Sequence, residues 1–271
     1  MVSRRVAVAL AAFLTSATLA CNSDRAYAPP DTMLTDLQVS RDVATSEGEA
    51  TAAELTALER SASITGITRS LSPDKPQGST CSFASADWTC APVLERGLTV
   101  VRSYSYRDSS NQPMQMFDAL KTASANFKVE INGIVSRDST FSGVVHRAQN
   151  ITVRGLLGDE TTRRWSGVGT SADTNTHRDL SSTRRYAGKS IDSLKAVVYP
   201  QPRLPGSYPL RGATVRVVSY NVTSTGRSTE RRSVDRRVVT TYNGTAEARI
   251  ESGGIVCTLH LDTHRVDGCS G

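Results

Sequence analysis

Apolar and polar residues alternate with a period of two along most of the chain after Ser79, most clearly over residues 127–132, 151–153 and 245–261. Residues two apart share one face of a β-strand, so this alternation predicts strands with one buried and one exposed face. No helical pattern separates these stretches, and parallel strands would need long crossovers between them. We therefore expect an all-β body of antiparallel strands that run up and down in chain order.

Glycine-containing turns mark where this meander reverses. Asn243-Gly244 has the composition of a two-residue hairpin turn, because both residues tolerate positive φ angles. Ser252-Gly253-Gly254 and Thr225-Gly226 predict two further reversals. Two architectures fit such a meander: a β-sandwich, or a curved sheet or half-barrel that wraps around a short helix.

One short N-terminal helix is expected before the strands. Ser46-Glu47-Gly48-Glu49 has the composition of a capping box, and apolar residues follow at helical spacing as far as Ser63. The apolar stripe is narrow, which predicts weak packing on the body. We therefore divide the mature chain into a flexible tether at 21–46, a short helix and Pro/Gly linker at 47–78, and an antiparallel β domain at 79–271.

Residues 1–20 have the composition of a secretory signal peptide. Arg4 and Arg5 precede an apolar stretch that is too short to span a bilayer as a mature helix, which needs ~20 residues. The stretch ends in Leu19-Ala20-Cys21, which resembles the lipobox of bacterial lipoproteins, although Thr18 stands where leucine is preferred. The resemblance implies a lipid anchor on Cys21, palmitate included. Ordinary cleavage that leaves a free cysteine is the alternative.

Four cysteines remain if Cys21 carries lipid, and an exported chain meets an oxidising compartment. We expect two local disulfides, one between Cys81 and Cys90 and one between Cys257 and Cys269, each joining the strands of a hairpin. A zinc site made of four thiolates is the alternative. The sequence lacks the CxxC spacing typical of such sites, which favours the disulfides.

The net charge of the mature chain limits the classes of partner, and the residue after Cys21 bears on its location. Loss of Arg4 and Arg5 with the signal lowers the formal charge from +6 to +4. This modest charge on an exported chain argues against nucleic acid as a partner. Asn22 after Cys21 favours the outer membrane by analogy with lipoprotein sorting. We therefore expect an exported body, lipid-anchored at the outer membrane or in the periplasm, with no cofactor.

Longer stretches carry two further resemblances. CSFASADWTC at 81–90, RGLTVVRSYSYRD at 96–108 and the stretch 242–269 are together similar to a group of bacterial lipoproteins, a likeness that implies no particular activity. The expected layout of a meander around a short helix is loosely similar to LolA/LolB-like carriers of the bacterial envelope. This second likeness implies a concave sheet face with room for a lipid, but no motif residue matches.

Two histidines near the C-terminus form a candidate metal site. His260, Asp262 and His264 would share one face of an uninterrupted strand, and two imidazoles with a carboxylate can hold zinc. However, pairing Cys257 with Cys269 places a turn at Thr263, which would move His264 off that face. The polar face of a terminal hairpin explains the same residues, and we favour it.

Asp173, His177 and Asp179 form a candidate for acid–base chemistry, because nearby carboxylates can orient a histidine base. No serine lies in a GxSxG elbow, and no cysteine is left over as a nucleophile. We favour an ordinary polar loop for this Ser/Thr-rich stretch and expect no enzyme activity.

Paired arginines are the most unusual feature of the chain, at 163–164, 184–185, 231–232 and 236–237. Guanidinium groups bind phosphate and carboxylate well. The candidate anion site for a glycan or a lipid headgroup therefore consists of Arg231, Arg232, Arg236 and Arg237. Glu230 and Asp235 are interleaved with them, which favours cross-strand ion pairs on a solvated face instead.

Two functional hypotheses follow from these patterns. The first is a lipid-anchored cell-envelope protein with a non-enzymatic binding or structural role. The alternative is a carrier on the periplasmic side that holds a lipid or another apolar ligand in the concave face of the sheet, where small side chains would leave room.

Overall fold

The computed structural model describes residues 34–64, 81–95, 97–136, 141–158, 160–204 and 206–271. The predictions on the signal peptide, on Cys21 and on most of the tether and linker lie outside these residues. Within them, no helix has the length and hydropathy of a membrane span. The elements are α1 (Asp36–Ile64), β1 (Cys81–Ala84), β2 (Asp87–Cys90), β3 (Val93–Glu95), β4 (Leu98–Asp108), β5 (Pro113–Met114), β6 (Thr122–Ser136), β7 (Phe141–Arg154), β8 (Thr162–Arg178), β9 (Thr183–Pro200), β10 (Arg211–Thr225), β11 (Thr229–Thr241), β12 (Glu247–Ser252), β13 (Ile255–His260) and β14 (Arg265–Ser270).

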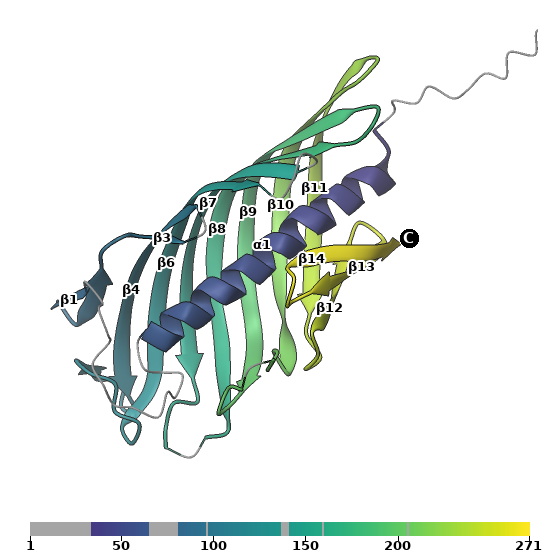
Figure 1. Cartoon of the computed structure of the whole chain (residues 1–271). Helices are drawn as coiled ribbons and strands as arrows, with labels where there is room; N and C mark the ends of the chain where they lie inside the picture. The colour runs from purple at the N-terminus through teal and green to yellow at the C-terminus, as the bar shows by residue number, and fades with distance from the viewer. Residues whose placement is uncertain (1–33, 65–80, 96, 137–140, 159, 205) are drawn as a thin grey trace, which may run out of the picture. The chain divides into compact units, whose positions relative to one another are not determined.

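The strands follow chain order in a single 14-stranded sheet. The path runs from β1, β2 and β4 through β6 to β14, while the short strands β3 and β5 pair with β4. Neighbouring strands are antiparallel, which confirms the predicted meander with one helix. The strands form one sheet rather than two packed sheets, so the sandwich alternative is wrong and the curved sheet is correct (Figure 1).

One face of this sheet is covered by α1 and is called the inner face below; the opposite face is called the outer face. Figure 1 shows α1 crossing the strands diagonally. Buried and exposed positions alternate along the long strands, as the period of two predicts. The core between helix and sheet contains Val39, Val43, Leu55 and Leu58 of α1 with Phe127, Val129, Val153, Trp165, Val218 and Leu259 of the strands.

The helix is longer and more deeply packed than the sequence predicts. It begins at Asp36, inside the stretch assigned to a flexible tether, and spans 29 residues. Thr35 precedes it, and the Thr35 side chain accepts a hydrogen bond from the Gln38 backbone N–H at 3.1 Å. The predicted capping box at Ser46 lies within the helix. The predicted weak packing was wrong, because α1 also buries polar side chains, among them Ser40, Glu47 and Thr51.

All three predicted turns lie at reversals between neighbouring antiparallel strands, and two of them are short. Gly253-Gly254 joins β12 to β13 with φ angles of 55° and 85°, and residues 226–228 join β10 to β11. Asn243-Gly244, in contrast, lies in the longer connection 242–246 between β11 and β12. There the Gly244 N–H donates to the Pro209 carbonyl at 2.8 Å. A contact with a distant connection therefore shapes this turn, which local sequence cannot reveal.

Both predicted cysteine pairs lie at disulfide distance. The sulfur atoms are 2.07 Å apart for Cys81 and Cys90, and 2.05 Å apart for Cys257 and Cys269. The first pair is directly opposed across β1 and β2, and the second joins β13 to β14. Each pair thus joins neighbouring strands, an arrangement compatible with an exported location.

Candidate functional site

Polar residues buried between α1 and the sheet form the candidate site, called the ion-pair network below. At its centre are Arg147 on β7 and Arg216 on β10, whose side chains are 4% and 1% exposed. A buried guanidinium is costly unless carboxylates compensate its charge, so the partners define the site. The network consists of Asp42, Ser46, Glu47, Thr51 and Glu54 on α1 and Arg147, Asp173, His177, Arg184, Tyr186, Asp192, Arg216 and Tyr220 on the strands.

Three side chains on one face of α1 reach the central arginines. Glu47, Thr51 and Glu54 have the spacing that places residues one above another along a helix. Arg216 donates from Nη1 to Glu47 Oε2 at 3.0 Å, from Nε to Thr51 Oγ1 at 3.1 Å, and from Nη2 to Glu54 Oε2. The other oxygen of Glu54 accepts from Arg147. Glu54 therefore bridges β7 and β10 from the helix side.

Carboxylates of the sheet complete the centre. Asp173 on β8 accepts from Arg147 Nη2 and from Ser171 Oγ, the latter at 3.0 Å. Asp192 on β9 accepts from Ser190 Oγ at 2.6 Å and lies 3.8 Å from Arg216 Nη1. The centre therefore holds more carboxyl groups than guanidinium groups.

Burial and the neighbouring guanidinium groups shift the pKa values of these carboxyl groups in opposite directions. Burial alone would raise the pKa of Glu54, but Arg216 and Arg147 outweigh burial, and the pKa of Glu54 lies below the usual glutamate value. Burial raises the pKa of Asp192 above the usual aspartate value, and Arg216 offsets this only in part. Glu54 is thus held as a charged partner, whereas Asp192 is the carboxyl group that takes up a proton more readily.

A second cluster lies nearer the start of α1. Asp42 accepts from Arg184 Nε at 2.6 Å and from the Tyr186 hydroxyl at 2.7 Å. Ser46 Oγ lies 2.9 Å from His177 Nε2. Burial raises the pKa of Tyr186, with a contribution from Asp42, and this keeps the phenol protonated as a donor. Strands β8 and β9 are joined to α1 by these bonds.

Ser46, His177 and Asp42 have the residue types of a nucleophilic triad, but not its geometry. The distance from His177 Nδ1 to Asp42 Oδ1 is 3.9 Å, too long for the hydrogen bond that orients such an imidazole. Asp42 is already the acceptor for Arg184 and Tyr186. All three residues are buried between α1 and the sheet, at 6%, 8% and 9% exposure, so a substrate does not reach them. We therefore interpret them as helix–sheet contacts.

The predicted polar loop around Asp173, His177 and Asp179 was wrong. Asp173 and His177 lie on β8 and are buried on the inner face, and Asp179 follows the strand and pairs with Arg184. A strand with polar residues on both faces has no apolar alternation. Its sequence therefore resembles a loop.

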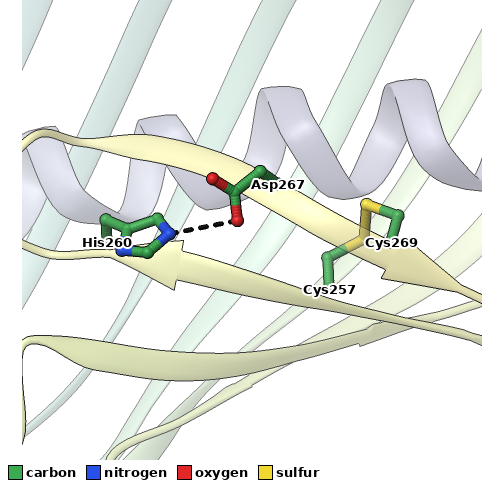
Figure 2. Close-up of a disulfide and its surroundings, with 4 residues drawn as sticks. All are labelled: Cys257, His260, Asp267 and Cys269. Carbon is green, nitrogen blue, oxygen red and sulfur yellow. Dashed lines mark hydrogen bonds and ion pairs between the residues drawn. A yellow bond between two sulfur atoms is a disulfide. The ribbon is translucent and has the colours of Figure 1, made fainter.

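His260, Asp262 and His264 are not brought together. His260 on β13 points towards Asp267 on β14, with 3.0 Å between Nε2 and Oδ1, beside the Cys257–Cys269 pair (Figure 2). His264 Nε2 instead lies 3.2 Å from Thr56 Oγ1 on α1. The turn at 261–264 separates the imidazoles, as the cysteine spacing predicts. Among the described residues there is no group of three side chains that could hold a metal ion.

The arginine pairs are each divided between the two faces, because neighbouring residues of a strand point to opposite sides. The more exposed members are Arg164, Arg185, Arg231 and Arg237, and the more buried members are Arg163, Arg184, Arg232 and Arg236. Arg232 and Arg236 both pair with Asp36 at the start of α1. The four arginines at 231–237 therefore do not lie together on one face of the sheet.

The predicted cross-strand ion pairs of Glu230 and Asp235 were also wrong. Glu230 accepts from the Leu34 backbone N–H at 3.0 Å, and Asp235 accepts from Ser219 Oγ at 2.6 Å. Glu230 therefore bonds to the chain before α1, and Asp235 bonds to the neighbouring strand β10. The carboxylate that pairs with Arg232 and Arg236 is Asp36 on the helix.

Neither Arg147 nor Arg216 stands out in the sequence, because each is a lone arginine. What could have identified Arg216 is its position in the alternating pattern. It shares a strand face with Val218, Tyr220 and Val222, all of which are buried. A charged residue on the apolar side of an alternating strand predicts a buried partner of opposite charge. That rule would have pointed to the acidic residues of α1.

What this site can do chemically follows from its burial. Its charged groups bond to one another, and the cavity beside Glu54, Gln149, Gly169 and Asp192 has a volume of about 10 Å³, the size of one water. The network is therefore suited to hold α1 on the sheet. Comparison of the chain with protein-family models, with curated proteins and with solved structures gave no match.

Proposed function

We propose that this protein is a lipid-anchored cell-envelope protein whose β body has a non-enzymatic binding or structural role. The observation that carries the proposal is the occupation of the inner face by α1, through the buried ion pairs of Arg147 and Arg216. A face filled by the chain's own helix leaves the outer face and the sheet ends for contacts with partners. The N-terminal sequence and the cysteine pairs at disulfide distance support export and an anchor on Cys21.

The mass of the N-terminal peptide of protein purified from the envelope tests the anchor. We expect a peptide that begins at Cys21 and carries fatty acyl chains. The Cys21→Ser variant is the control, and it should lack these chains and leave the membrane fraction. A mature peptide with an unmodified Cys21 thiol would overturn the anchored form of the proposal.

A carrier of a lipid or other apolar ligand is the second candidate. It is favoured by incomplete packing under the second half of α1, where Trp165 Nε1 and Gln149 Oε1 are buried without a hydrogen-bond partner among the described residues. A ligand of lipid size would nevertheless require α1 to leave the inner face. The carrier therefore depends on a movement of the helix, whereas the structural role does not.

Native mass spectrometry of the unlipidated Cys21→Ser protein separates the two candidates. A structural role with α1 in place predicts the bare protein mass. A reproducible additional mass in the range of a lipid would instead support the carrier. Arg216→Met provides a matched sample with a weakened helix contact, and a carrier should then bind more ligand.

A further inference from the structure

Four exposed arginines lie in one row across the outer face. Strand register links them: Arg107 pairs with Ser124, Ser124 with Arg154, Arg154 with Arg164, and Arg164 and Arg211 both pair with Val198. At ~4.8 Å per strand, the row spans about 24 Å from β4 to β10. Arg107, Arg154, Arg164 and Arg211 are called the arginine row below.

Within the described parts of the chain, the arginine row lacks carboxylate partners. Arg154 and Arg164 are directly opposed on neighbouring strands, where like charges are destabilising. Arg107 donates to the carbonyl oxygen of Asn111 at 2.9 Å. Among the described acids of the adjoining turns, Asp108, Asp118 and Glu160 accept backbone N–H groups of their own turns. The row therefore differs from Arg147, Arg184 and Arg216 on the inner face, which have carboxylate partners.

Exposed apolar side chains lie at the same end of the sheet. Met116 and Leu120, between β5 and β6, are 70% and 81% exposed, and Leu204 and Leu210, between β9 and β10, are 64% and 42% exposed. Backbone hydrogen bonds join the connection after β5 to the one after β7, and that one to the connection after β9. The connections thus form one continuous edge, called the loop edge below. Exposed apolar groups beside unpaired positive charge indicate an interaction site.

We propose that the loop edge and the arginine row dock on the surface of a lipid bilayer that contains anionic lipids. The apolar side chains enter the interfacial region, and the guanidinium groups bind lipid phosphates. A soluble anionic glycan would use the arginines alone and leave the four apolar side chains in water, so the observations favour the bilayer.

This docking goes beyond the proposed anchor and does not depend on it. The described chain enters at the opposite end of the sheet, where the Leu34 N–H donates to Glu230 at the start of β11. The loop edge instead lies where β6 and β10 begin and where β7 and β9 end. The Cys21→Ser protein, which lacks the anchor, is therefore the correct sample for a test.

Flotation with vesicles of phosphatidylethanolamine and phosphatidylglycerol, compared with phosphatidylcholine vesicles, tests the proposal on the Cys21→Ser protein. We expect binding to the anionic vesicles only.

The double variant Arg154→Gln/Arg164→Gln should bind about 30-fold more weakly, at roughly fivefold per arginine. Leu120→Ser/Leu204→Ser should bind about tenfold more weakly, because less apolar area is buried. Arg231→Gln/Arg237→Gln, on the same face away from the edge, is the matched control and should bind normally.

Four results would overturn the proposal: equal binding to both vesicle types, no binding to either, equal weakening in the control variant, or full binding by the leucine variant. The last result would indicate a site for soluble anions. All substituted side chains are exposed, so unchanged circular dichroism spectra and melting temperatures verify the fold of each variant.

A Leu120→Trp variant gives a direct second measurement of insertion into the bilayer. Brominated anionic lipids should quench the fluorescence of its new tryptophan, and absence of quenching would contradict insertion.

Discussion

Arg216 makes several buried contacts between α1 and the sheet. It bonds to Glu47, Thr51 and Glu54, and it lies close to Asp192. Its removal would leave two glutamates buried without their main counter-ion. Such an uncompensated charge is more costly than the net contribution of an intact pair.

Arg216→Met is therefore expected to lower the free energy of unfolding by about 3 to 5 kcal/mol, measured by urea denaturation. Arg237→Met, on the exposed outer face, is the control and should change it by about 0.5 kcal/mol or less. Adding Glu47→Gln to Arg216→Met should recover part of the loss, because Glu47 forms its ion pair with Arg216 and its unpaired charge disappears. Equal losses for Arg216→Met and Arg237→Met would contradict the buried network.

His260 offers a separate prediction at the surface. Its hydrogen bond to Asp267 raises the pKa of His260 above the ordinary value of 6.5. The stabilisation from this pair is fully present below the unfolded-state pKa and is lost as the pH rises through the higher folded-state pKa. An NMR titration should show the raised pKa, and Asp267→Asn should lower it. An unshifted His260, or a shift that survives Asp267→Asn, would contradict the contact in Figure 2.

The residue types of the site were visible in the sequence, but their partners were not. The paired arginines attracted notice, yet the central guanidiniums belong to the lone Arg147 and Arg216. Strand alternation fixes which face a residue occupies, and that is enough to divide Arg231 from Arg232. It contains no information on where a helix from another part of the chain lies. Glu54 and Arg216 are distant in sequence, so their pairing depends on the three-dimensional fold.

At the scale of elements, α1 differs most from its prediction. The helix packs against the C-terminal strands as well as the long ones, and Gly48 marks a close approach. A Cβ atom at Gly48 would overlap the side chains of Ile250 on β12 and Val266 on β14. The absence of a side chain at this position therefore lets the helix lie close to the end of the sheet.

Gly48→Leu should consequently destabilise the protein by about 1 to 3 kcal/mol, although leucine favours helices more than glycine does. Arg41→Leu places the same side chain on an exposed position of α1 and is the control, with an expected change of about 0.5 kcal/mol or less. Thermal unfolding of both variants supplies the measurement. A more stable Gly48→Leu protein would show that α1 does not pack closely on β12 and β14.

The strands were far more predictable than the helix. Period-two alternation identifies β6 around Phe127 and β12 around Ile250 because one face of each strand packs apolar groups. The same reasoning failed for β8 around Asp173, whose inner face is polar and buried. Helical spacing in turn underestimated the length of α1, because buried acids such as Glu47 interrupt the apolar stripe by which an amphipathic helix is recognised.

At the scale of the described body, helix and sheet depend on each other. The inner face carries Arg147, Arg184 and Arg216, and α1 carries the acids that compensate them. Without α1, these guanidiniums and a large apolar surface would face water. The helix is therefore part of the core, and the free surfaces for partners are the outer face and the loop edge.

Hydrogen exchange of the α1 backbone amides in the native protein tests this account most directly. If α1 is part of the core, its buried amides should exchange only through global unfolding, with the same protection as the amides of β8 and β10. Arg216→Met should speed exchange of helix and strands together. Rapid exchange of α1 in a sheet that stays protected would contradict the account, because it would show a helix that leaves the inner face independently.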